Sequence, residues 1–198
     1  MQEYFEELWR RLPANAEPSD FELRREYLLQ GVRGGERALD IGCGAGQFSA
    51  ALDAAGVEVT GVEVAQAALE RARARHPRID FRLIAPDAPL PFEDNSYEVV
   101  WAGEVIEHIA DTGRWLSEVR RVLTPRGRLL LSTPSHGRLQ VAVRGVEHFS
   151  QPLGDHLHLY TRRSLARLLK EFGFCEVQVR PAGGLPLMSR LLLAKGVR

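Results

Sequence analysis

The chain has 198 residues, of which 44% are hydrophobic and 26% are charged, and its 26 basic and 26 acidic side chains give a net charge of zero. This composition excludes a disordered tail and lacks the basic excess that nucleic-acid binders carry. A chain of this size can bury one core, so we predict a single domain over 1–198.

Several features bear on the cellular compartment. The two cysteines, Cys43 and Cys175, are far apart and fit neither a disulfide framework nor a zinc motif. The N-terminal segment is acidic and amphipathic, without the apolar region of a signal peptide. No apolar run approaches the roughly 18 residues that a membrane span requires. We therefore expect a cytoplasmic protein with no membrane span and no nucleic-acid partner.

Strand and helix patterns alternate along most of the chain. Two helices come first, and Asp20 is the predicted N-cap of the second. Predicted strands cover 37–41, 58–62, 79–84, 97–102, 128–132, 175–179 and 191–195, and predicted helices cover 2–12, 47–55, 65–75, 114–123 and 161–172. This alternation is typical of a mainly parallel sheet with helices on both faces. Since ligands of such sheets bind at the carboxyl ends of the strands, functional residues are expected just after each strand.

A glycine-rich loop follows the first strand, in Asp40-Ile-Gly42-Cys-Gly44-Ala-Gly46. Glycine allows sharp turns and a close approach of the backbone to a ligand. The last two glycines are one residue too close for the dinucleotide motif GxGxxG. Asp40 is also an unfavourable neighbour for a phosphate. The loop therefore suits a ligand with adenosine but no phosphates, although a simple tight turn would explain the glycines equally well.

Acidic side chains also follow the next two strands. Glu63 stands about 20 residues after Gly42, where a carboxylate can accept the hydroxyl protons of a ribose. Asp87 follows the third strand and can accept a hydrogen bond from an exocyclic amine such as that of adenine. Each could be a solvated surface group, but together with Asp40 they form a much stronger pattern than any one alone.

Four segments carry a family resemblance: ALDIGCGAG, TGVEVA, PDAPLPFEDNSYEVV and GEVIEHI. In this order and spacing they resemble the class I S-adenosylmethionine-dependent methyltransferases, of the small-molecule type that includes ubiquinone-biosynthesis enzymes. The resemblance implies a Rossmann-like α/β fold with a doubly wound, mostly parallel seven-stranded sheet whose last strand is antiparallel. We accordingly divide the single domain into a helical lid, a cofactor-binding core, an acceptor-side segment, and a C-terminal helix with strands, over 1–33, 34–133, 134–160 and 161–198.

The resemblance also implies the cofactor, S-adenosyl-L-methionine, with S-adenosyl-L-homocysteine as the product. Asp40, Gly42 and Gly44 match residues around the methionine part of the cofactor. Ala102 and Gly103 match the place where the backbone after the fourth strand meets the cofactor's amino group.

The adenosine part of the cofactor is matched by four further positions. Glu63 corresponds to the ribose ligand, and Val64 to a residue that packs on the adenine. Asp87 and Ala88 correspond to the pair at the adenine edge. Pro86 replaces the usual glycine before the adenine aspartate, so a contact through that amide is in doubt because proline has no N–H.

Histidines are the candidates for chemistry at the acceptor. The cofactor carries the reactive group, and the protein must position the acceptor and exclude water. A hydroxyl acceptor also needs a base. We consider His108 after the fourth strand, and His156 and His158, which with His136 and His148 lie in or beside the long segment after the fifth strand. A structural role for most of them is the competing interpretation, and we predict that His156 or His158 contacts the acceptor.

A metal site in this segment is an alternative that we do not favour. His148, Asp155, His156 and His158 are ligand types that bind zinc. However, HLHLYT resembles the family's ordinary lead-in to the next helix. We therefore predict no metal.

The predicted function is methyl transfer from S-adenosylmethionine to a small-molecule acceptor, with oxygen preferred over nitrogen or carbon. A macromolecular RNA or protein methyltransferase is one alternative, disfavoured because Ala102-Gly-Glu-Val replaces the Pro-Pro-aromatic motif of base-amino enzymes. A non-catalytic S-adenosylmethionine-binding module is another. A dehydrogenase is disfavoured by the spacing of the glycine loop. The acceptor's identity and the oligomeric state stay open.

Overall fold

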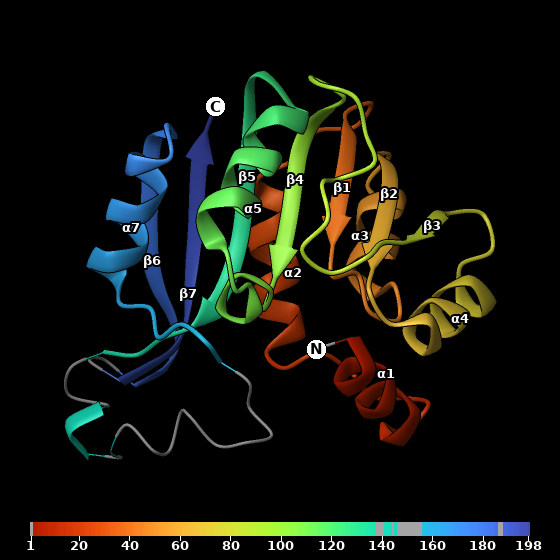
Figure 1. The fold of residues 1–198 in the computed structure, drawn as a ribbon, viewed down its shortest axis with the longest axis horizontal. Coiled ribbons are helices and arrows are strands. Elements are labelled where there is room, and N and C mark those ends of the chain that lie inside the picture. The colour runs from red at the N-terminus through yellow and green to blue at the C-terminus, as the bar shows by residue number, and fades with distance from the viewer. Residues whose placement is uncertain (1, 138–140, 144, 146–155, 186–187) are drawn as a thin grey trace.

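The computed structural model describes residues 2–137, 141–143, 145, 156–185 and 188–198. Within these residues one seven-stranded sheet has the order β3-β2-β1-β4-β5-β7-β6 (Figure 1). The strands are β1 (Arg37–Ile41), β2 (Glu58–Glu63), β3 (Asp80–Leu83), β4 (Tyr97–Gly103), β5 (Leu123–Pro134), β6 (Cys175–Leu185) and β7 (Met188–Val197). The helices are α1 (Gln2–Arg11), α2 (Phe21–Gln30), α3 (Gln47–Ala54), α4 (Gln66–Arg75), α5 (Thr112–Val122) and α7 (Arg162–Glu171), with the 3-10 helix η1 (Ile106–His108).

The strand directions confirm the predicted fold class. β1 pairs in parallel with β2 on one side and with β4 on the other, so the chain changes its winding direction between β1 and β4. β7 is antiparallel to both β5 and β6. Doubly wound sheets bind ligands at the carboxyl ends of the strands beside such a switch point, which here are the ends of β1 and β4.

The C-terminal hairpin is longer than its sequence pattern predicts. β6 and β7 stay paired from Cys175 opposite Val197 to Leu185 opposite Met188, and the hairpin extends beyond the rest of the sheet (Figure 1). Gly183 and Gly184 have positive φ angles, and glycine and proline are poor signals for a strand. The prediction therefore stopped at the last run of apolar residues.

Asp20 stands at the N-cap position of α2, as predicted, but its side chain makes no capping hydrogen bond. Its carboxylate instead accepts a hydrogen bond from Nε of Arg190 in β7 at 3.2 Å. The predicted capping role is therefore wrong. The carboxylate pairs with an arginine that is distant in the sequence, and not with the N–H groups of the first turn of α2.

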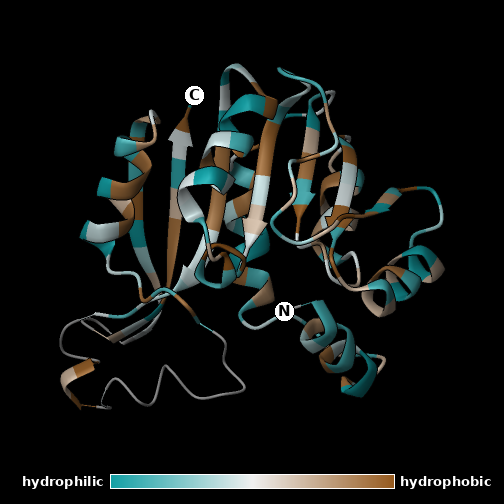
Figure 2. Ribbon diagram, viewed as in Figure 1, coloured by the Kyte–Doolittle hydropathy of each residue, from teal (hydrophilic) through white to brown (hydrophobic). Residues whose placement is uncertain are grey.

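Apolar side chains fill both faces of the sheet. On one face, α2 and α3 pack through Leu28, Phe48 and Leu52 against Trp101 and Leu130. A larger cluster on the other face joins the sheet to α5 and α7. Figure 2 shows the resulting pattern, with hydrophobic strands in the middle and polar helix surfaces outside. No helix in the described part of the chain is both long enough and apolar enough to cross a membrane.

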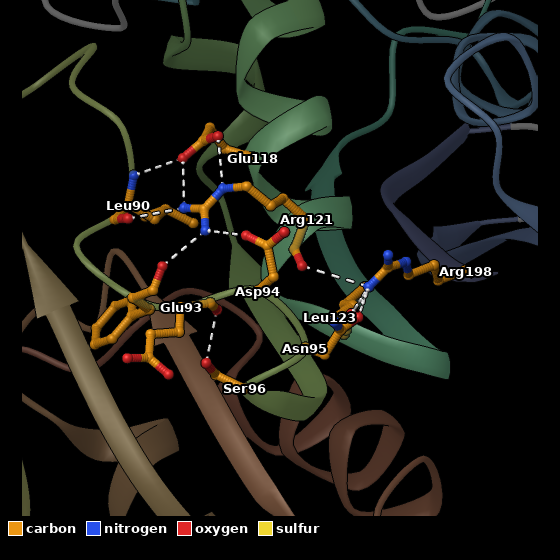
Figure 3. A network of polar contacts seen from close by, with 10 residues as sticks. Leu90, Glu93, Asp94, Asn95, Ser96, Glu118, Arg121, Leu123 and Arg198 are labelled. Carbon is orange, nitrogen blue, oxygen red and sulfur yellow. Dashed lines mark hydrogen bonds and ion pairs between the residues drawn. The ribbon is translucent and has the colours of Figure 1, made fainter.

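The loop between β3 and β4 is tied to α5 by polar side chains (Figure 3). Glu118 accepts a hydrogen bond from the Leu90 N–H at 2.9 Å. Arg121 donates to the carbonyl oxygens of Leu90 and Phe92 at 2.9 and 2.7 Å, and to Asp94 at 2.9 Å. Because Arg121 also pairs with Glu118, one helix fixes the loop that carries Asp87.

Replacing this arginine should loosen the loop. We expect Arg121→Ala to lower the free energy of unfolding by about 2–3 kcal/mol, because hydrogen bonds to charged groups are lost and two carbonyls lose a donor. Urea denaturation measures this difference. Arg167→Ala is the matched control, since it removes only an exposed pair with Glu171 and should cost less than about 0.5 kcal/mol. Equal losses in the two variants would contradict the role of Arg121.

Candidate active site

A cavity of about 420 Å³ lies beyond the carboxyl ends of β1, β2 and β4. This volume is in the range of small-molecule and cofactor sites. The glycine loop, the loop after β3 and the segment after β4 contribute to its wall. Phe5, Leu8 and Trp9 of α1 also line it, so a helix from the predicted lid covers the end of the sheet.

The glycine loop is closely packed from two sides. Gly42 and Gly44 have φ angles of +69° and +55°, which favour glycine. A Cβ atom at Gly42 would lie 2.6 Å from the Val105 side chain, and one at Gly44 would lie 2.8 Å from the Trp9 ring. Both the backbone conformation and the neighbouring side chains therefore require glycine at these positions.

Glu63 joins the end of β2 to the glycine loop. Its carboxylate accepts hydrogen bonds from the N–H groups of Val64 at 2.7 Å, Ala65 at 3.1 Å and Gly44 at 3.1 Å. Burial raises the pKa of Glu63, and these three N–H groups oppose that rise. The side chain is 7% exposed and lines the cavity, so a buried acidic group faces any ligand there.

Seven of the nine residues predicted to bind the cofactor line this cavity: Gly42, Gly44, Glu63, Val64, Asp87, Ala88 and Gly103. Asp87 adopts a φ of +58°, which is unusual for a non-glycine residue. Such backbone strain is often found at functional sites. The structure thus brings together residues from the ends of four strands, β1 to β4.

The other two predicted cofactor residues, Asp40 and Ala102, lie behind the cavity wall. Both are buried, and neither lines the cavity. Asp40 accepts a hydrogen bond from the Ser49 hydroxyl at 2.6 Å. Burial raises the pKa of Asp40 to about 7. Asp40 therefore connects β1 to α3 in this structure, whereas the sequence placed it beside the methionine part of the cofactor.

Sequence reasoning missed Arg24, a charged residue of α2 that lines the cavity and is only 2% exposed. Its Nη1 donates to the Ser19 carbonyl at 3.1 Å, and its guanidinium lies 4.8 Å from the centre of the Phe48 ring. Its Nε has no hydrogen-bond partner among the described residues. A signal was available, because Arg24 precedes the buried Leu28 by one helical turn and so shares its inward face.

Two glutamates follow β4. Glu104 lines the cavity at a φ of +59° and accepts a hydrogen bond from the Ser132 hydroxyl at 3.1 Å. Glu107 is fully buried and accepts a hydrogen bond from the Thr133 hydroxyl at 2.9 Å. Burial raises the pKa of Glu107 well above its usual range, the nearby Glu104 raises it further, and Arg24 opposes both effects.

The structure brings together two of the three histidines predicted to act at the acceptor and places the third away from the cavity. His108 lines the cavity, with its ring 5.5 Å from that of Phe5. His156 lies next to it, with 5.2 Å between the ring centres. His158 does not line the cavity, and its Nε2 donates to the Ile109 carbonyl at 2.9 Å. His148, which was also considered, lies outside the described residues together with Asp155.

The comparisons with known proteins agree with this geometry. A family model described as a methyltransferase domain matches residues 1–179. A ubiquinone biosynthesis O-methyltransferase of Burkholderia pseudomallei (strain 1710b) is 29% identical over 170 residues, covering 81% of this chain and 73% of the relative. The 27-O-demethylrifamycin SV methyltransferase of Amycolatopsis mediterranei (strain S699) is 40% identical over 106 residues, covering 50% and 39%.

A solved structure shares the fold. The phosphoethanolamine N-methyltransferase 2 of Haemonchus contortus, in complex with S-adenosyl-L-methionine, superposes with a TM-score of 0.75. The match covers 100% of this chain and 57% of the other, at 20% sequence identity. At this identity the likeness concerns the fold alone.

Gly44 offers a test of how the lid helix meets the glycine loop. We expect Gly44→Ala to displace the Trp9 ring and so change the tryptophan fluorescence, besides costing about 1–2 kcal/mol in stability for the left-handed backbone. Gly35→Ala is the matched control, because Gly35 also has a positive φ but has open space around its Cβ position. A fluorescence spectrum that is equally unchanged in both variants would show that Trp9 does not rest on the loop.

Proposed function

This chain belongs to the methyltransferase domain family and is an S-adenosylmethionine-dependent enzyme, and on that premise we propose that it methylates a hydroxyl oxygen of a small, largely apolar molecule. The observation that carries the proposal is the cavity at the switch point, where an acidic binding end meets an apolar lid. Family membership removes the dehydrogenase alternative. A cytoplasmic location stays a prediction.

The acidic end of the cavity suits the cofactor. S-adenosylmethionine supplies a methyl group that is already activated on a positively charged sulfur. Glu63 at the end of β2 has its carboxylate at the cavity wall, where it can accept the hydroxyl protons of the ribose. Asp87 in the next loop can accept from the adenine amine. The glycine loop allows the backbone to approach the cofactor closely.

Arg24 is suited to bind the cofactor's carboxylate. It lines the cavity beside Gly103, where an added Cβ would collide with its Nη2. Because its Nε has no partner among the described residues, it has donor capacity left for an anion, and planar guanidinium groups match carboxylates well. Its packing on Phe48 fixes the orientation of the group.

The acceptor side of the cavity favours an apolar ring. Phe5, Leu8 and Trp9 from the lid and Trp115 from α5 line it. Aromatic side chains of this kind bury large apolar ligands and exclude water. The two curated relatives whose names specify O-methylation support oxygen as the acceptor atom. Among the predicted histidines, His108 lines this cavity and is adjacent to His156, so we assign both to the acceptor hydroxyl.

The ribose assignment can be tested by calorimetry. We expect Glu63→Ala to weaken the binding of S-adenosylhomocysteine about 10- to 100-fold, because the hydrogen bonds of a charged acceptor are lost. Glu63→Gln keeps the shape and one acceptor oxygen, and it should bind with intermediate affinity. Glu58→Ala, at the exposed start of the same strand, is the control and should bind normally. Wild-type affinity in a folded Glu63→Ala protein would refute the assignment.

The acceptor class can be tested with methyl-labelled S-adenosylmethionine. We expect label to appear in methyl ethers of phenols and catechols, and not in matched anilines, because the proposal requires an oxygen nucleophile on an apolar ring. Product analysis by mass spectrometry distinguishes the two. Parallel reactions with total RNA and with total protein serve as the macromolecular comparison. Label confined to RNA, protein or amines would overturn the proposal.

A further inference from the structure

Three side chains at the edge of the cavity converge on one point. Glu107 and His108 come from η1, and His156 comes from the segment that leads to α7. One possible ligand atom from each, a carboxylate oxygen and two ring nitrogens, all lie within 4.8 Å of one another. His108 also lines the cavity, so this cluster of three residues adjoins the proposed acceptor site.

The Glu107 carboxylate has a hydrogen-bond partner among the described residues at only one of its two oxygens. Its Oε2 accepts a hydrogen bond from the Thr133 hydroxyl, but Oε1 has no hydrogen-bond partner among the described residues. Nε2 of His108 lies 3.9 Å from Oε1, which is too far for a hydrogen bond. Since Glu107 is fully buried, an acceptor left in this state is costly. A cation between the carboxylate and the imidazoles would remove that cost.

The donor set selects the kind of cation. Two imidazoles and one carboxylate are a known set for zinc and neighbouring transition metals, whereas magnesium and calcium prefer sites made of oxygen alone. In a tetrahedral site with bonds of about 2.1 Å, two ligand atoms lie about 3.4 Å apart. The ligand atoms of the cluster lie within 4.8 Å of one another, so side-chain rotations must bring them about 1 Å closer together when the ion binds.

We propose that Glu107, His108 and His156 bind one divalent transition-metal ion of the zinc class, and that this ion holds the acceptor hydroxyl for methyl transfer. The geometry of the cluster is the argument that the ion binds. The role of the ion in catalysis depends in addition on the proposed function. With three protein ligands, positions remain open for a substrate oxygen, as in catalytic zinc sites.

The ion would make the hydroxyl a better nucleophile by lowering its pKa. The hydroxyl proton leaves to water. A lone pair of the oxygen then forms the bond to the methyl carbon, while the electron pair of the carbon–sulfur bond returns to sulfur. The products are the methyl ether, neutral S-adenosylhomocysteine and one proton, so charge and atoms balance without any other reactant.

Metal binding can be measured without donor or acceptor. Chelator-treated protein is titrated with Zn²⁺ in a calorimeter and with Co²⁺ in a spectrophotometer, where the visible absorption of cobalt reports its ligands. We expect one ion per chain. Glu107→Gln and His156→Ala should each weaken binding by more than about tenfold. His76→Ala is the matched control, because this half-buried histidine lies outside the cluster and should bind the ion normally.

Each result has a distinct meaning. Circular dichroism and S-adenosylhomocysteine binding establish that the variants are folded, and His156→Ala serves if Glu107→Gln does not fold. Absence of saturable binding by the wild type, or equal binding in all variants, overturns the site. Catechol should shift the cobalt spectrum, and an unchanged spectrum overturns the hydroxyl role. Metal binding by a chain that methylates only amines refutes the proposed function but leaves the site standing.

Discussion

The burial of acidic side chains at the carboxyl ends of the strands is the constraint on which the site depends. Asp40, Glu63 and Glu107 are buried, and Arg24 is the one arginine or lysine that is buried among the described residues. Burying a carboxylate is expensive unless hydrogen bonds or a cation compensate it. Three backbone N–H groups stabilise Glu63 and a serine hydroxyl stabilises Asp40. Burial still raises the pKa of all three carboxyls, and a positively charged ligand would stabilise their ionised forms.

Helix α1 covers the cavity that these acidic groups border. Its position is fixed by hydrogen bonds to α4, outside the cavity. Glu6 of α1 accepts a hydrogen bond from the Ala67 N–H at the beginning of α4, at 3.2 Å. Arg71 of α4 donates to the carbonyls of Leu12 and Pro13, at 2.8 and 3.1 Å. These bonds hold α1 in place while Trp9 rests on the glycine loop. An apolar cover strengthens the electrostatic interactions beneath it, because it reduces their contact with water.

The sequence predicts what local patterns encode, and it misses what only tertiary contacts decide. Alternating strands and helices, and a glycine loop after β1, follow from short-range periodicity and conformational freedom. Arg24 was not predicted as a site residue, because a charged side chain on a helix is usually exposed to solvent. The metal ligands considered from sequence were neighbours along the chain, whereas the cluster combines His156 with Glu107 and His108, which the fold brings from another strand end.

The same charge arrangement would distinguish the two forms of the cofactor. S-adenosylmethionine carries a sulfonium that S-adenosylhomocysteine lacks, so the acidic end of the cavity would attract the substrate form more strongly than the product. Glu63 contacts the glycine loop, while Glu107 lies with the two histidines, so each proposed cation has its own carboxylate. Transfer of the methyl group removes one of the two positive charges and leaves the other. On the proposed function, the acidic groups would then hold S-adenosylhomocysteine less strongly than S-adenosylmethionine, which would favour release of the product.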